Sequence, residues 1–165
     1  MTRPIVWALG VLGSACLTAA VGGPHLAARF GTDSAGMAES GSARAVTLHA
    51  DWRGHFYAHP SVGGRRLRML VDTGATTVAL AYDDAVSAGF KLDPRDFTQK
   101  IATANGVVST ARVRIPEMRL GDIVLRDVDA VVAPRGGLDT SLLGMSFLRR
   151  LGGFDIARGR LTLRA

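Results

Sequence analysis

The feature that most constrains this chain is an acidic turn set between two apolar segments, within residues 67–80. The first five of these residues are mostly apolar and predict a short strand that ends at Asp72, and a second apolar segment follows at 78–80. Gly74 permits backbone angles that are closed to other residues, and the hydroxyl of Thr73 can hold the turn with a hydrogen bond. An ordinary Asx turn uses the same residue types. The apolar segments on both sides of the turn indicate, in addition, that the carboxylate lies at the edge of a core, where its solvation can be controlled.

The first part of the chain differs from the rest in composition. Residues 5–23 carry no charge, and about 20 apolar residues are enough for a helix to cross a bilayer. Arg3 precedes them, which places the N-terminus in the cytoplasm and the remainder across the membrane under the positive-inside rule. We therefore predict a transmembrane anchor over residues 1–23. A cleaved signal peptide is the alternative, with small residues near Ala19 or Ala27 as its cleavage site.

The composition of the 165-residue chain excludes several classes of protein. Its single cysteine, Cys16, lies in the apolar segment, so the remainder has no internal disulfide and no thiolate chemistry. The formal net charge of +6 comes mostly from scattered arginines, and only 6% of the residues are aromatic. Nucleic-acid binding would need a basic cluster with interleaved aromatic residues, so we expect no nucleic-acid partner.

Beyond the apolar segment, the sequence predicts a linker and one β-rich domain. Residues 24–44 are rich in small and polar residues, which is typical of a flexible linker. Residues 45–165 predict many short strands joined by tight turns, so the expected fold class is all-β. The turns are marked by Gly63-Gly64, Asn105-Gly106 and Gly121-Asp122. One or two helical turns are expected at 82–89, and one clear short helix at 143–151 ends at Gly152.

Four motifs, in this order, resemble those of the retropepsin-like aspartic peptidases of clan AA, and most closely the bacterial membrane-anchored, single-domain members. The motifs are Gly54-His55-Phe56-Tyr57, Leu70-Val71-Asp72-Thr73-Gly74-Ala75-Thr76, Thr103-Ala104-Asn105-Gly106 and Leu142-Leu143-Gly144-Met145-Ser146-Phe147-Leu148, all within residues 46–165. The resemblance implies a closed β-barrel of the acid protease fold with one short C-terminal helix. It also implies a homodimer with one Asp-Thr-Gly from each subunit. The domain would lie in the periplasm, tethered to the bacterial inner membrane through residues 5–23.

The resemblance assigns the chemistry to paired aspartates that activate a water for peptide hydrolysis. Asp72 is the expected catalytic residue, one from each subunit. Asp139 follows a glycine-containing loop rather than a buried strand, so we do not expect it to be catalytic. The last strand, at 160–164, is the expected place for dimer pairing. The other implied site residues are Thr73, Gly74 and Ala75 in the active-site turn, Thr103, Ala104, Asn105 and Gly106 in a flap over the substrate, and Leu142, Leu143 and Gly144 beside the turn.

No metal and no cofactor are expected. His49, His55 and His59 lie near one another in the sequence, but no second cluster of His, Cys or Glu accompanies them, so strand or surface histidines are the better interpretation. We therefore expect an aspartic endopeptidase that acts on polypeptide substrates. One alternative is a module of the same fold that binds peptides or dimerises without cutting. Another is an enzyme that matures only itself by cutting within residues 24–44.

Overall fold

The computed structural model describes residues 44–103 and 106–165. The chain divides into two units, Met1–Gly41 and Ser42–Ala165, and all described residues belong to the second unit. The predicted anchor at 5–23 and almost all of the predicted linker lie outside the described residues, so both stay predictions. Within the described ranges, every helix is too short or too polar to cross a membrane.

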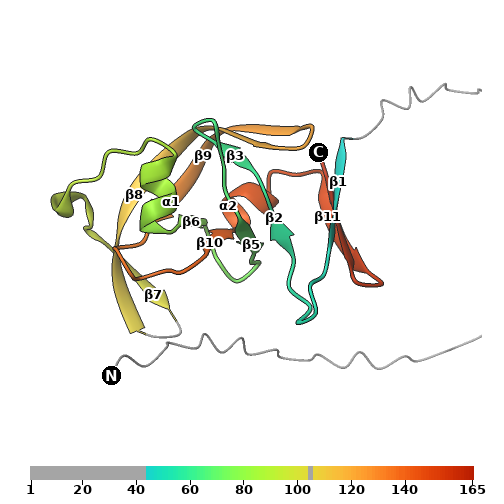
Figure 1. Cartoon of the computed structure of the whole chain (residues 1–165), viewed down its shortest axis with the longest axis horizontal. Coiled ribbons are helices and arrows are strands. Elements are labelled where there is room, and N and C mark those ends of the chain that lie inside the picture. The colour runs from blue at the N-terminus through green and yellow to red at the C-terminus, as the bar shows by residue number, and fades with distance from the viewer. Residues whose placement is uncertain (1–43, 104–105) are drawn as a thin grey trace, which may run out of the picture. The chain divides into compact units, whose positions relative to one another are not determined.

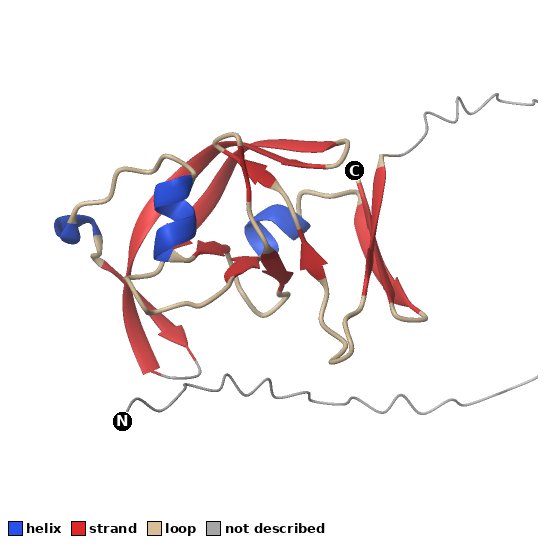
Figure 2. Ribbon diagram, viewed as in Figure 1, coloured by secondary structure: helices blue, strands red, loops and turns tan. Residues whose placement is uncertain are grey.

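Short strands dominate the described unit, and two short helices lie between them (Figures 1 and 2). The strands are β1 (Ala45–His49), β2 (Tyr57–Ala58), β3 (Ser61–Val62), β4 (Arg65–Arg66), β5 (Met69–Val71), β6 (Val78–Leu80), β7 (Gln99–Thr103), β8 (Gly106–Leu120), β9 (Ile123–Val132), β10 (Ser141–Leu143), β11 (Gly153–Ala157) and β12 (Arg160–Arg164). The helices are α1 (Tyr82–Ser87), α2 (Met145–Leu148) and the single 3-10 turn η1 (Pro94–Asp96). The mostly β fold class is thereby confirmed.

The main sheet is curled and has the strand order β2-β5-β10-β6-β9-β8-β3-β4, with β7 added along β8. Within this sheet, β10 lies between β5 and β6 and runs parallel to β5 and antiparallel to β6. The end strands β2 and β4 do not pair with each other in the described residues, so the sheet is a half-barrel and not the expected closed barrel. Each end strand has only two residues, and Pro60 soon after β2 has no amide hydrogen with which to extend the ladder.

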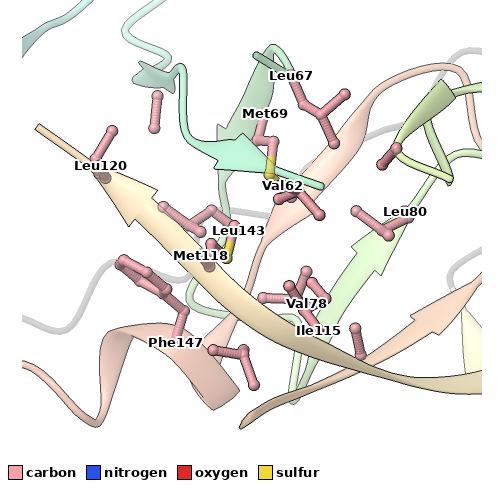
Figure 3. Packing of buried hydrophobic residues seen from close by; sticks show 14 of the residues in the cluster. Val62, Leu67, Met69, Val78, Leu80, Ile115, Met118, Leu120, Leu143 and Phe147 are labelled. Atoms are coloured by element: carbon pink, nitrogen blue, oxygen red, sulfur yellow. The ribbon is translucent and has the colours of Figure 1, made fainter. Parts of the chain in front are cut away.

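The hydrophobic core lies inside this curl and is filled by alternate strand residues and by α2 (Figure 3). Ile115 and Met118 of β8 are fully buried, and so is Leu143 of β10. Phe147 of α2 is the largest of the fully buried side chains in the described residues. Along β8 the three arginines, Arg112, Arg114 and Arg119, are exposed, whereas Ala111, Ile115, Met118 and Leu120 are buried.

Two of the predicted turns are found where the glycines indicate. Gly63 and Gly64 connect β3 to β4 with φ angles of 55° and 76°, which only glycine adopts without strain. The β8–β9 hairpin turns at Gly121, with a φ of 55°. In the β7–β8 hairpin Thr103 pairs with Gly106, so Gly106 is already part of β8 and not of the turn.

The helices differ from the expectation of one clear C-terminal helix. The helical turns expected at 82–89 form α1, which is followed by Gly89 with a φ of 91°. The helix expected at 143–151 is only four residues long, from Met145 to Leu148. Leu143 belongs instead to β10, because its carbonyl oxygen accepts a hydrogen bond from the Asp72 amide and thereby joins the sheet.

A second sheet is formed by the two ends of the described unit, in the order β1-β12-β11. Leu161 and Leu163 of β12 are buried, and their neighbours Arg160 and Arg164 are exposed, as strict alternation predicts. The last strand is therefore central, and both of its backbone edges are paired within one chain. The expectation that residues 160–164 pair with a second subunit is wrong for this sheet, since the strands with a free edge are β1 and β11.

Candidate active site

The candidate site is the turn that follows β5. Asp72 comes directly after this strand, and its amide donates to the carbonyl oxygen of Leu143 at 3.2 Å, which fixes the turn to β10. The Asp72 side chain accepts from the amide of Gly74 at 2.8 Å, and its carbonyl oxygen accepts from the amide of Ala75 at 3.3 Å. The turn therefore has the geometry of an Asx turn at the end of a largely buried strand. Asp72 is half-buried in the single chain, and Thr73 and Gly74 are exposed.

The segment from Leu142 to Gly144 lies against this turn. The amide of Met145 donates to the carbonyl oxygen of Ala75 at 2.8 Å, which joins the start of α2 to the end of the turn. A Cβ atom on Gly144 would lie 2.1 Å from the carbonyl oxygen of Thr77 and 2.7 Å from that of Ala75. Real Cβ atoms do not approach this closely, so only glycine lets the two backbones meet.

Two buried or half-buried serines support the same segment. Ser141 accepts from the amide of Ala81 at 2.9 Å and donates to a carboxylate oxygen of Asp84 on α1. Ser146 accepts from the amide of Val78 at 2.8 Å and donates to the carbonyl oxygen of Asp129 at 2.7 Å. Each hydroxyl thereby satisfies one backbone amide, at the start of β6 for Val78 and just after its end for Ala81. No supporting role was predicted from the sequence for either serine, although Ser146 lies within the fourth motif and the two are the only hydroxyl residues in the apolar run 141–148.

A tight loop between β1 and β2 flanks the candidate site. The amide of Val71 donates to the carbonyl oxygen of Phe56 at 2.9 Å, so the chain leaving this loop runs beside the end of β5. Within the loop, Asp51 Oδ1 accepts from the amides of Arg53 at 2.9 Å and His55 at 2.8 Å. The hydrogen bond from the His55 amide is the largest cause that lowers the pKa of Asp51, and the Arg53 amide adds to it.

The predicted flap corresponds to the hairpin of β7 with the first part of β8, which projects from the main sheet (Figure 1). The Thr103 hydroxyl donates to the carbonyl oxygen of Gly106 at 2.8 Å. Ala104 and Asn105, also predicted for the flap, lie outside the described residues. Opposite each other on one face of the hairpin, Ile101 and Val108 are half-buried.

Asp139 does not approach Asp72 along the sheet. Strands β10 and β5 run parallel, with Ser141 beside Met69 and Leu143 beside Val71. Asp139 precedes β10, whereas Asp72 follows β5, so the two acids lie off opposite ends of neighbouring strands. Asp139 is also exposed. The described chain thus presents one strand-borne acidic turn of this kind.

The three histidines near the site do not form a metal centre in the described residues. Within residues 44–103 and 106–165, no group of three His, Cys, Asp or Glu side chains is placed to hold a metal ion. The ring of His55 pairs with Asp51 at 3.7 Å and packs edge-on against Tyr57. His49 is an exposed residue of β1, and His59 is an exposed residue of the short connection after β2.

The sequence matches a known family. The model of the family described as aspartyl protease matches residues 58–147, a little more than half of the chain. An uncharacterized protein in the cobV 5′ region of Sinorhizobium sp is 42% identical over 135 residues, which cover 81% of this chain and 54% of that protein. The uncharacterized protein RP867 of Rickettsia prowazekii (strain Madrid E) is 37% identical over 110 residues, covering 67% of this chain and 47% of that protein. The chain spans about half the length of these curated relatives.

Solved structures show the same fold. A retropepsin-like aspartic protease from Rickettsia conorii superposes with a TM-score of 0.66 at 33% identity, covering 73% of this chain and 90% of that protein. EIAV protease, solved in complex with the inhibitor HBY-793, superposes with a TM-score of 0.51 at 19% identity, covering 61% of this chain and 91% of that protein. The second likeness concerns the fold alone.

The close approach at Gly144 predicts a steric effect of substitution. We expect Gly144→Ala to lower the free energy of unfolding by about 1–3 kcal/mol or more, because the added methyl group meets fixed carbonyl oxygens. Gly153→Ala is the matched control, since a Cβ there meets nothing within 4 Å and should change stability by less than about 0.5 kcal/mol. Chemical denaturation of the two variants measures the difference. Equal effects would contradict the tight contact.

The lowered pKa of Asp51 predicts a pH-dependent contribution to stability. The folded state prefers the charged carboxylate, so this contribution is complete above the unfolded pKa of about 3.9 and is lost as the pH falls through the lower folded pKa. Asp51→Asn should therefore lower the unfolding temperature at pH 7, and the difference from the wild type should narrow below about pH 4. Thermal unfolding across pH measures it, with Asp139→Asn as the control. A difference in unfolding temperature that stays constant down to pH 2 would contradict the lowered pKa of Asp51.

Proposed function

This chain belongs to the aspartyl protease family, in its retropepsin-like branch, and from that premise we propose that it is an aspartic endopeptidase that cuts polypeptides as a homodimer. The observation that carries the proposal is the Asp72 turn, held rigidly on β5 and β10 while Thr73 and Gly74 remain exposed. A structural Asx turn does not need an acid at the open end of a buried strand. An acid in this position is accessible both to a partner and to a substrate.

The proposed reaction needs two carboxylates that share one proton, because like charges a few ångströms apart cannot both ionise easily. Asp72 supplies one carboxylate and the partner subunit's Asp72 supplies the other, about a two-fold axis. The ionised carboxylate takes a proton from a bound water, and the oxygen of that water attacks the peptide carbonyl carbon. The protonated carboxyl group donates to the carbonyl oxygen. The C–N bond of the resulting tetrahedral intermediate then breaks as a proton passes to the leaving nitrogen.

Several further roles belong to this proposal. Thr73 stabilises the active-site turn across the dimer, and its exposure in the single chain is consistent with a partner. The hairpin of β7 and β8 closes over an extended peptide and excludes water from the reacting bond. The peptide pairs with backbone groups as an added strand. Neither a metal nor a cofactor takes part.

We also propose that the enzyme works at the bacterial inner membrane. Residues 5–23 would anchor it, and residues 45–165 would lie in the periplasm as the protease domain, joined by the linker at 24–44. The uncharged composition of residues 5–23 supports this placement.

The proposal predicts that the carboxylate of Asp72 is required for cleavage. Asp72→Asn should reduce cleavage of a peptide library by at least about a hundredfold, the usual contribution of a positioned acid or base, without unfolding the protein. Asp139→Asn is the matched control and should cleave as the wild type does. Mass spectrometry of the digested library gives the rates, and circular dichroism checks folding.

Two outcomes would count against the proposal. Retained cleavage by the Asp72→Asn variant would show that the carboxylate of Asp72 is not needed for the reaction. A wild-type protein that binds peptides but leaves them uncut at every pH would favour the non-enzymatic module instead.

A further inference from the structure

The most exposed large hydrophobic side chain among the described residues is that of Trp52, with 85% of its surface accessible. The guanidinium group of Arg53 stacks on the indole ring, with its Cζ atom 4.3 Å from the ring centroid. Hydrated apolar surface is unfavourable, and Trp and Arg are enriched at the contacts that dominate binding between proteins. The pair is suited to a contact that the single chain does not make.

The loop that presents Trp52 is already ordered. Asp51 binds the amides on either side of Gly54, and its own amide donates to the carbonyl oxygen of His55 at 2.8 Å. Gly54 has a φ of 83°, which closes the loop without strain. A preformed loop loses little conformational entropy when it binds, so little of the binding free energy is lost in ordering it.

This loop lies beside the Asp72 turn. The hydrogen bond between the Val71 amide and the Phe56 carbonyl oxygen places the end of the loop within a residue or two of Asp72 along the paired chains. In Figure 1 the loop between β1 and β2 and the turn between β5 and β6 both extend toward the lower side of the unit. The loop and the acidic turn are therefore neighbouring segments of the structure.

We infer that Trp52, with Arg53 stacked on it, is an anchor that inserts against a second copy of this chain next to the paired Asp72 turns. The inference rests on the proposed dimeric protease. With a two-fold axis between the turns, we expect the loop of each subunit to pack against the surface beside the partner's turn. Assembly of the catalytic pair and burial of the two indoles then occur together, so the dimer contact regulates the activity.

A second copy is the occupant that the site itself requires. The described chain offers one strand-borne acidic turn, and the reaction needs two carboxylates. Three of the five exposed large hydrophobic residues in the described part lie on the terminal sheet or its loop, namely Trp52, Phe154 and Ile156. This concentration at one end of the unit is typical of a protein–protein contact.

The test uses residues 42–165, a unit that contains the whole described core, with Asp72→Asn to prevent self-digestion. Trp52 is the only tryptophan in this unit. Its emission spectrum is recorded over a dilution series in parallel with sedimentation. If Trp52 is the anchor, we expect its emission maximum to shift to shorter wavelength in step with dimer formation. A dimer whose tryptophan emits as a hydrated indole would overturn it.

A substitution gives the second arm of the test. Trp52→Ala should raise the dissociation constant of the dimer at least about tenfold and should lower cleavage by the active protein at dilute concentration. Cleavage should recover when that protein is concentrated, which a damaged catalytic turn would not allow. Val86→Ala removes another exposed apolar side chain, on α1, and should leave the dissociation constant unchanged.

The outcomes separate this inference from the proposed function. A wild type that dimerises and cuts, with Trp52→Ala equal to it, would overturn the anchor and leave the protease intact. A wild type that neither dimerises nor cuts would overturn both. A shift in emission that appears only on addition of a peptide or of anionic lipid vesicles, while the protein stays monomeric, would assign the loop to that ligand and overturn the dimer contact.

Discussion

The candidate site depends on one close approach of two backbones. Gly144 lies so near the carbonyl oxygens of Ala75 and Thr77 that no side chain fits between them, and the Met145 amide binds Ala75 directly. This contact lets β10 enter between β5 and β6, which places the acidic turn on a buried support. A carboxylate on such a support keeps its direction without a partner, so little reorganisation is needed when a substrate arrives.

Under the proposed mechanism, a single chain holds only half of the site. Asp72 is half-buried, its neighbours Thr73 and Gly74 are exposed, and the loop beside them presents a tryptophan to solvent. The terminal sheet uses β12 internally and leaves β1 and β11 as its free edges. In the proposed dimer these features belong to a half-site, whose second carboxylate comes from the partner subunit, so that association and catalysis are linked.

The sequence predicts the local features of this fold well and the long-range ones poorly. The turns at Gly63 and Gly121 follow from the conformational freedom of glycine, and the acidic turn at Asp72 follows from its apolar flanks. The central position of β12 could not be predicted, because its two neighbours come from distant parts of the chain. The supporting roles of Ser141 and Ser146 were missed for the same reason, since the backbone amides from which they accept are 60 and 68 residues away. The role of Asp51 in its loop was missed because the sequence of that loop does not differ from that of an ordinary turn.

The central claim, that two copies of Asp72 form one active site, is tested most directly by mixing subunits. Inactive Asp72→Asn protein is added in increasing excess to a fixed amount of wild type, and cleavage of a peptide is followed after the subunits have exchanged. Shared sites predict that cleavage falls toward zero, because nearly every wild-type chain then pairs with an inactive one. Cleavage that stays constant at a large excess of the variant would contradict the account, since each wild-type chain would then hold a complete active site.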